Sequence, residues 1–301
     1  MTQQNISSST SKEIFSQWYD KYYKILLFIP IILLALSFIQ LGISYSTTGN
    51  VIEKDISLSG GTSITAHGSL DSTTEARLMN EFDNINLRKL TDIRSGEATS
   101  FIIETSSTPE EIKPKLEQVI GYKLDETNAN IEFTGSTLSN NFYRQLITAL
   151  VASFILMSLV VFLLFRSFVP SLAVIFAAFA DLVMTLALVN IIGLKLSAAG
   201  IAAFLMLVGY SVDTDILLTS RALKRKDIPL NSRIFSAFKT GILMTLTALI
   251  AVLPIFFITT GIPDSFRQIF IILSIGLSAD ILNTWLTNAS LIKWYCEKKQ
   301  I

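Results

Sequence analysis

The sequence LMLVGYSVDTDILLTSRALKRK, residues 205–226, is the stretch that most constrains how this chain can fold. It places two carboxylates, Asp213 and Asp215, in the last turns of an otherwise apolar run of membrane length. A charged side chain deep in a bilayer costs roughly 2.5–3.5 kcal/mol on insertion scales, so such residues usually face a protein interior or a water path and have a function. Basic residues follow at Arg221, Lys224, Arg225 and Lys226, which is typical of a helix end on the cytoplasmic side.

The composition of the whole chain indicates a membrane protein. Half of its 301 residues are hydrophobic, only 16% are charged and the mean hydropathy is +0.52. About 20 apolar residues are needed to cross a hydrocarbon core roughly 30 Å thick. The sequence therefore predicts six transmembrane helices, at Lys24–Gly42, Leu146–Phe165, Val169–Gly193, Leu196–Thr219, Thr240–Ile258 and Gln268–Lys293. The second and third are separated by so few residues that they must form a tight helical hairpin.

Lys and Arg predict the orientation of these helices. With the N-terminus inside the cell, the cytoplasmic segments hold thirteen basic residues, whereas the short outer loops hold only Lys195 and Arg267. Because cytoplasmic loops carry the excess of Lys and Arg, we expect a cell-membrane protein with both tails, 1–23 and 294–301, in the cytoplasm. The large hydrophilic block, residues 43–145, is then extracytoplasmic, and residues 146–293 form a five-helix region. The single cysteine, Cys296, lies in the C-terminal tail and excludes an internal disulfide.

The extracytoplasmic block is long enough for one small domain. Its nine basic and fifteen acidic residues give a formal charge of 9 − 15 = −6, which argues against a nucleic-acid surface. Its only histidine, His67, excludes a histidine-rich metal site. The pattern predicts a ferredoxin-like α+β domain, with the order β-α-β-β-α-β. The expected strands are Ile56–Ala66, Leu87–Arg94, Thr99–Thr105 and Asn130–Gly135, and the expected helices are Thr73–Asn84 and the segment from Thr108 to Gly121.

A glycine pair, Gly60-Gly61, lies within the first expected strand. We interpret it as a bulge or a tight backbone approach. A contact with a substrate is the alternative interpretation.

Four acids within the predicted membrane helices are candidates for proton relay or conformational coupling. Asp181 and Asp280 fall near the middle of the third and sixth helices, and Asp213 falls about 9 Å to the cytoplasmic side of the centre of the fourth. Asp213 and Asp215 point about 160° apart on a helix, so they cannot share one proton as a pair. Gly209 lies on the face of Asp213 and, with Gly200, allows a neighbouring helix to approach closely.

Each of these acids also has a structural interpretation. Asp213 can form a hydrogen bond to a partner chain or to another helix. Asp215 fits an interfacial charge that extends to the membrane surface or pairs with Lys or Arg. Asp181 and Asp280 can make polar contacts between helices.

The remaining polar residues of the helices are interpreted more simply. Lys239 is a candidate counter-ion for a carboxylate, or else a cytoplasmic anchor at the start of the fifth helix. Three asparagines are expected to form packing hydrogen bonds: Asn190, Asn283 and Asn288.

Two quoted motifs carry a resemblance to a known family. The first motif, SLSGGTSI at residues 57–64, follows the first predicted helix. The second motif, VGYSVDTDILLTSRALKRK, lies on the fourth predicted helix and contains the packing residues Gly209, Tyr210, Ser211 and Thr214. With six helices and one outer domain, the chain resembles the SecF proteins of the SecD/SecF family, particularly the archaeal ones. Weaker support comes from FKTGILMTLTALIAVLP, from Phe238, and SADILNTWLTN, from Ser278. The bacterial pattern differs at the stretch that corresponds to residues 209–215, where it reads roughly Gly-x-Ser-Ile-Asn-Asp-Thr.

The resemblance implies membership of the resistance-nodulation-division superfamily, in which two six-helix chains would form a twelve-helix unit. It implies a SecD-like partner in the bilayer, the Sec translocation channel and an exported polypeptide as further contacts. The bacterial members are thought to couple proton flow to movement of the outer domain.

The chemistry of the chain excludes several function classes. The sequence has no Gly-rich phosphate loop, no Cys/His metal cluster and no nucleophile–base–acid set. We therefore expect no enzyme activity, no cofactor and no metal. Two functions remain: a Sec-accessory coupling subunit, and a small-molecule or lipid transporter of the same superfamily. A purely structural scaffold would need no acids at the membrane midplane.

Overall fold

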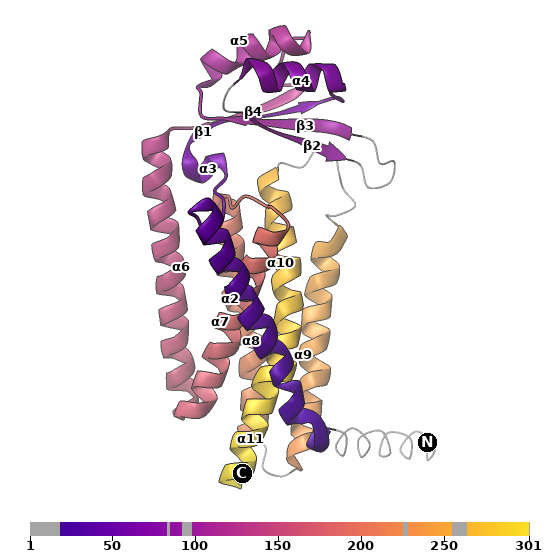
Figure 1. Cartoon of the computed structure of the whole chain (residues 1–301). Coiled ribbons are helices and arrows are strands. Elements are labelled where there is room, and N and C mark those ends of the chain that lie inside the picture. The colour runs from indigo at the N-terminus through magenta and orange to yellow at the C-terminus, as the bar shows by residue number, and fades with distance from the viewer. Residues whose placement is uncertain (1–18, 83–84, 92–97, 225–227, 255–263, 301) are drawn as a thin grey trace, which may run out of the picture.

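The structure, a computed structural model, describes residues 19–82, 85–91, 98–224, 228–254 and 264–300. A long helical bundle carries a small α+β domain at one end, as Figure 1 shows. Six helices are long and apolar enough to cross a membrane: Tyr19–Thr48, Ser139–Phe165, Phe168–Ile191, Ala198–Lys224, Leu230–Val252 and Phe266–Lys299. The predicted fold class, with the domain between the first and second membrane helices, is confirmed. Arg225, Lys226 and the end of the fifth predicted helix lie outside the described residues.

The bundle is made of α2 (Phe28–Thr48), α6 (Ser136–Phe165), α7 (Phe168–Ile191), α8 (Ala198–Lys224), α9 (Leu230–Val252), α10 (Asp264–Leu282), the π-helix η2 (Asn283–Asn288) and α11 (Ala289–Lys299). The expected tight hairpin joins α6 to α7, where Arg166 adopts a left-handed conformation with φ 49°. The first membrane helix has a turn at Leu27, just before α2. Pro30 explains it, because proline has no backbone N–H to continue the helical hydrogen bonds.

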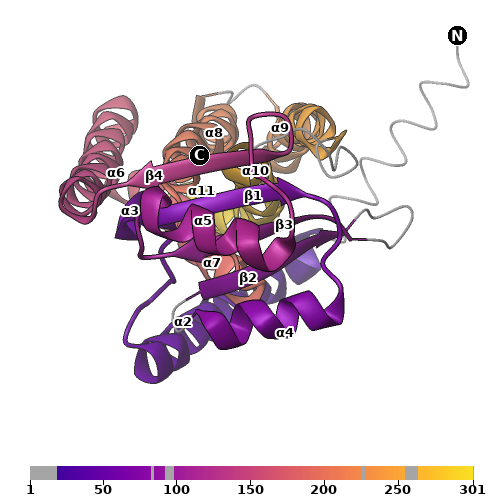
Figure 2. The same ribbon diagram turned by 90° about the horizontal axis from the view of Figure 1, so that it is seen from above.

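The domain is a four-stranded antiparallel sheet in the order β2-β3-β1-β4. Its strands are β1 (Gly61–His67), β2 (Ile85–Thr91), β3 (Ala98–Thr105) and β4 (Ala129–Thr134). The helices α4 (Ser72–Glu81) and α5 (Pro109–Ile120) pack on the same face of the sheet (Figures 1 and 2). Ile64, Leu78, Phe101 and Leu116 are buried between these layers. The opposite face looks toward the bundle, and the described elements follow the expected order β-α-β-β-α-β.

The predicted strand Ile56–Ala66 is wrong in its first half. Residues 56–59 form a helical turn, α3 (Ile56–Ser59), and the strand begins at Gly61. Ile56 and Leu58 alternate as in a strand, but Leu58 is fully buried in the core of the bundle, together with residues of α7, α8 and α10. The backbone passes from α3 into β1 at the glycine pair. Gly61 has φ 133°, and a Cβ there would lie 2.3 Å from the Thr105 carbonyl oxygen. The expected tight backbone approach at this pair is therefore present.

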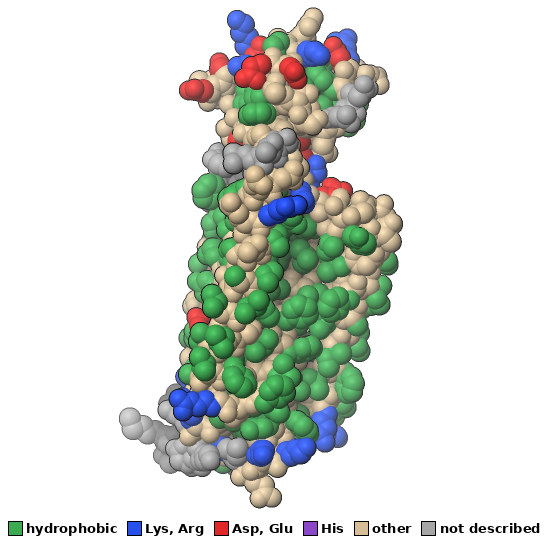
Figure 3. All heavy atoms as spheres, turned by 90° about the vertical axis from the view of Figure 1, so that its left-hand side faces the viewer, with side chains coloured by type: hydrophobic (Ala, Val, Ile, Leu, Met, Phe, Trp, Pro, Cys, Tyr) green, Lys and Arg blue, Asp and Glu red, His purple; other side chains and the backbone are tan. Residues whose placement is uncertain are grey.

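The surface of the bundle is apolar where a membrane would surround it. Figure 3 shows hydrophobic side chains covering one face of the helical part, with Lys and Arg gathered at the end away from the domain. Large exposed hydrophobic residues include Ile32 and Ile39 on α2, and Ile155 and Leu163 on α6. Their exposure is explained by a lipid environment.

Candidate functional site

Three carboxylates from three helices meet inside the bundle. Asp181 on α7, Asp215 on α8 and Asp280 on α10 are all fully buried. Asp181 lies next to the middle of α7, so this group lies deep in the membrane part of the protein. We call these three residues the carboxyl cluster.

Side-chain hydroxyls and amides surround the cluster. Ser211 Oγ donates to Asp181 at 2.5 Å, and Thr214 Oγ1 lies 3.1 Å from Asp280 Oδ1. Two side-chain amides of η2 also donate to the cluster. Asn283 Nδ2 donates to Asp181 at 2.7 Å, and Asn288 Nδ2 donates to Asp215 at 2.7 Å. Thr284 Oγ1 lies 2.9 Å from Asp215 and 3.0 Å from Asp280, so one hydroxyl connects two carboxyl groups.

The charge balance of the cluster favours the binding of positive charge. No Lys or Arg of the described residues forms a salt bridge with it. Three buried negative charges without a cation are very unfavourable, so the cluster is expected to hold protons. Asp215 Oδ2, Asn283 Oδ1 and Asn288 Oδ1 are also buried acceptors without a hydrogen-bond donor among the described residues. The described part of the chain has no group of His, Cys, Asp and Glu arranged to hold a metal ion.

The placement of Asp215 corrects one interpretation of the sequence. Asp215 is not an interfacial charge that extends to the membrane surface, because it is buried and bonded to η2. Helical periodicity correctly separated it from Asp213, but could not say which of the two points inward.

Asp213 lies on the opposite, exposed face of α8. Met206, Gly209 and Tyr210 are exposed with it, and their spacing makes a continuous line along the helix. We call these four residues the α8 stripe. The expected close approach of another helix at Gly209 does not occur within this chain, since a Cβ there would meet nothing within 4 Å. Gly200, in contrast, is buried against Gln268 on α10.

Lys239 is exposed on α9, and no described carboxylate pairs with it in the structure. Its predicted role as a counter-ion for the buried acids therefore gains no support from the geometry.

The segment η2 contributes most of what sequence reasoning missed. A π-helix is rare, and short π-helical segments often occur at functional sites. Here its turns direct Asn283, Thr284 and Asn288 toward the carboxyl cluster. The asparagines were expected only to form packing hydrogen bonds. Asp280, Thr284 and Asn288 follow one another at intervals of four residues, and this spacing was the available signal for a polar helix face.

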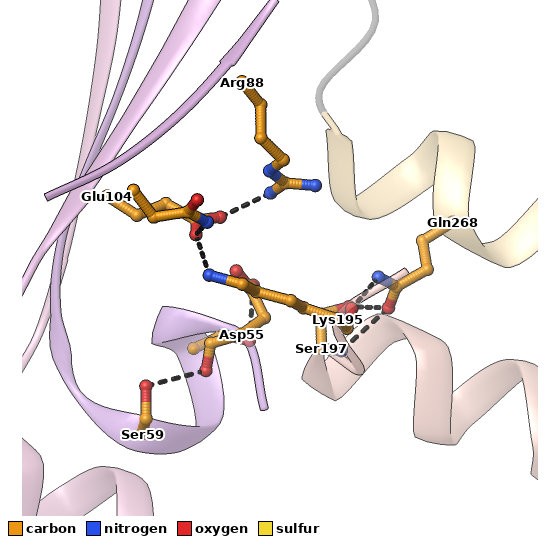
Figure 4. A network of polar contacts seen from close by, with 9 residues as sticks. Asp55, Ser59, Arg88, Glu104, Lys195, Ser197 and Gln268 are labelled. Carbon is orange, nitrogen blue, oxygen red and sulfur yellow. Dashed lines mark hydrogen bonds and ion pairs between the residues drawn. The ribbon is translucent and has the colours of Figure 1, made fainter. Parts of the chain in front are cut away.

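A second polar network joins the domain to the bundle, as Figure 4 shows. Glu104 on β3 is paired with Arg88 on β2, and accepts from Lys195 at 2.6 Å. Lys195 belongs to the loop between α7 and α8. In the same loop, Leu196 N donates to Glu53 O at 2.7 Å and Asp55 N donates to Leu196 O at 2.9 Å. The helices that carry Asp181 and Asp215 are thus bonded to the domain through their shared loop.

The acids of this junction differ in their electrostatics. Burial raises the pKa of Asp55, and the nearby negative charge of Glu104 adds to the rise. Burial also acts to raise the pKa of Glu104, but the hydrogen bond from Lys195 and the positive charge of Arg88 outweigh it, so the pKa of Glu104 is lowered. Glu104 is therefore the ionised partner of Lys195 at neutral pH.

Comparison with known proteins gives consistent matches. A family model described as protein export membrane protein SecD/SecF, C-terminal, matches residues 115–298. The protein-export membrane protein SecF of Methanolacinia petrolearia is 37% identical over 271 residues, covering 90% of this chain and 93% of that protein. The protein of the same name from Methanocaldococcus jannaschii is 36% identical over 282 residues, covering 91% and 96%.

A solved structure is similar in fold. The crystal structure of SecDF, a translocon-associated membrane protein from Thermus thermophilus, matches with a TM-score of 0.72 at 18% identity. The match covers 92% of this chain but only 38% of that one, so this chain corresponds to a part of the longer polypeptide.

Proposed function

The chain belongs to the SecD/SecF family of protein-export membrane proteins, and we propose that it is a SecF-like subunit that assists translocation through the Sec channel. We propose further that proton binding at the carboxyl cluster is coupled to movement of the outer domain. The observation that carries the coupling is the cluster itself, in which three buried carboxylates from three helices share hydroxyl and amide donors without a paired cation.

A change of charge in the cluster would alter the packing of three helices together. Neutralising one carboxyl changes which hydrogen bonds it can accept or donate, and the packed helices then favour a different arrangement. Because α7 and α8 meet at the loop that binds Glu53, Asp55 and Glu104, their displacement would be transmitted to the domain. This connection supports the proposed coupling between ion binding and domain movement.

A SecD-like six-helix chain is the proposed partner. The α8 stripe presents Asp213 on a surface that lipid would otherwise cover, and exposing a charged side chain of a membrane helix to lipid has a cost in free energy. A second chain packed on the stripe would remove that cost. The similarity to one part of the longer SecDF polypeptide supports this arrangement. In the complex that we propose, the N- and C-termini of this chain are cytoplasmic and its domain is extracytoplasmic.

Affinity purification in a mild detergent, combined with a measurement of export, tests the function. Asp280→Asn and Asp215→Asn keep the shape of the side chains but remove their ionisation. We expect both variants to recover the SecD-like partner and Sec channel subunits at the normal level, while the rate of export of a secreted reporter falls.

Asp213→Asn serves as the comparison, because it changes an intramembrane carboxylate outside the cluster. Its expected effect is reduced recovery of the partner. Normal export with Asp280→Asn and Asp215→Asn would contradict the coupling, and recovery of a homo-oligomer with bound lipid in place of channel subunits would favour a transporter.

A further inference from the structure

A surface cleft of about 450 Å³ lies between the beginning of the first membrane helix and α11. It is lined by Tyr23, Lys24, Leu27, Ser290, Leu291 and Trp294. In Figure 1, α11 is at the end of the bundle away from the domain. The back of the cleft is fixed by two hydrogen bonds, from Ser290 Oγ to Tyr23 O at 2.9 Å and from Tyr23 Oη to Glu297 at 2.8 Å.

One basic residue lines the cleft and a second lies beside it. Lys24 lines the cleft, and Lys298 Nζ lies 5.1 Å from the ring centroid of Trp294. Neither lysine forms an ion pair with a residue that the structure describes. The nearby acids Asp20 and Glu297 are both engaged by the buried Lys293. The three lysines Lys24, Lys293 and Lys298 outnumber these two acids by one, so a negatively charged group would meet a net positive charge here.

The positions of these residues along the helices match the layers of a bilayer. Lys24 begins the apolar run predicted as the first membrane helix, and Trp294 directly follows Lys293, the last residue of the sixth, so both lie at the boundary of the predicted membrane segments. The interfacial layer on each side of a bilayer is about 5–8 Å thick. Leu27 and Leu291 lie about 4.5 Å deeper, one helical turn toward the hydrocarbon. The cleft is thus basic and aromatic at headgroup depth and apolar below it.

We propose that this cleft binds an anionic phospholipid of the surrounding leaflet. The phosphate lies at Lys24 and Lys298, and an acyl chain lies along Leu27 and Leu291. Trp and Tyr at the membrane interface and basic residues beside them are the chemistry that recognises such a headgroup. A basic residue near an anionic surface contributes about fivefold to the attraction, so each of the two lysines is expected to add about that much to the preference for anionic lipid in the cleft.

Fluorescence quenching of Trp294 tests the site. The full chain is reconstituted in phosphatidylcholine nanodiscs that contain a small fraction of brominated phosphatidylglycerol or brominated phosphatidylcholine. Subtraction of the quenching seen with Trp294→Phe isolates the signal of this residue. We expect stronger quenching by the phosphatidylglycerol probe, and a roughly fivefold loss of that preference in Lys24→Gln and in Lys298→Gln.

Three controls separate this site from general electrostatics. Lys24→Arg should retain the preference, and Lys224→Gln, which removes a basic residue at the end of α8, should leave it unchanged. Inorganic phosphate added at constant ionic strength should not displace the lipid. Equal quenching by both lipids, an equal effect of Lys224→Gln, or displacement by free phosphate would each overturn the proposal.

Discussion

At the scale of single residues, Thr284 occupies the most constrained position of the carboxyl cluster. Its hydroxyl has one proton but lies within hydrogen-bond distance of Asp215 and Asp280. If Thr284 donates to one carboxyl group, the other must itself be protonated to share a hydrogen bond with the same oxygen. Thr284 therefore makes the protonation of the two acids interdependent.

Thr284→Val tests this interdependence, because valine keeps the branched shape and removes the hydroxyl. We expect the free energy of unfolding to fall by about 1–3 kcal/mol, since buried carboxyl oxygens lose a donor. Partner recovery should remain, and the rate of export should fall.

Thr287→Val is the matched control. Thr287 is buried in the same π-helix, but its hydroxyl has no hydrogen-bond partner among the described residues. A loss of export as large with Thr287→Val as with Thr284→Val would show that packing of η2, and not the shared hydroxyl, is responsible.

At the scale of elements, the loop between α7 and α8 is the connection between membrane and domain. Lys195 Nζ bonds Glu104 on β3, whose side chain is only 4% exposed. The backbone of Leu196 bonds both Glu53 and Asp55. The loop therefore holds the domain by one ion pair and two backbone hydrogen bonds.

Lys195→Met should weaken this connection measurably. Removing one partner of a largely buried charge costs about 1.5–3 kcal/mol of unfolding free energy. Lys89→Met is the control, because its pair with Glu75 is about one-third exposed on both sides and is expected to contribute 0–1 kcal/mol. Thermal unfolding of both variants in detergent measures the difference.

The destabilisation by Lys195→Met should depend on pH. The pKa of Glu104 is lowered in the folded protein, so its stabilising contribution is complete above the pKa of the unfolded chain and is lost as the pH falls through the folded value. The gap between the parent chain and Lys195→Met is expected to be largest at neutral pH and to narrow in acid. A gap that does not change with pH would exclude Glu104 ionisation as its source.

At the scale of the whole molecule, much of the bundle surface is uncovered. Only 6% of the most apolar window of the second membrane helix is buried, against 61% for the third. Lipid can cover such apolar surface, but the α8 stripe also contains Asp213. The bundle therefore has one face suited to lipid and one suited to a second chain.

Gly209→Leu tests the stripe as an interface. No atom of this chain lies within 4 Å of the added Cβ, and leucine favours a helix over glycine by about 0.5–1 kcal/mol. The isolated variant should be at least as stable as the parent, while recovery of the partner should fall. Gly42→Leu, at an equally open position on α2, should have no effect on recovery of the partner. Equal recovery of the partner with both variants would show that the α8 stripe is not the contact surface.

Cysteine labelling in intact cells tests the orientation. Cys296 is fully buried and would not react from either side, so it is replaced by serine. Cysteine at Ser72, exposed on α4, should react with an impermeant reagent, whereas cysteine at Lys299, exposed at the end of α11, should not. The reverse pattern would place the domain in the cytoplasm.

The sequence by itself determined the membrane helices and the order of elements in the domain, because both depend on local pattern. Apolar length predicts a helix that can span a bilayer, and alternation, proline and glycine predict strands and helix ends. The end of α5 at Gly121, with φ 82°, is such a local signal. Local pattern failed at Ile56 and Leu58, where burial against the bundle selects a helical turn over a strand.

The composition of the carboxyl cluster was decided only by tertiary structure. Asp213 and Asp215 are equivalent in sequence, two residues apart on one apolar helix. Their difference arises because α8 packs tightly on α10, where a Cβ at Gly276 would lie 2.4 Å from Leu207. This contact turns Asp215 inward to η2 and leaves Asp213 outside. The direction of a side chain depends on which helix faces meet, and residues far apart in the sequence determine that.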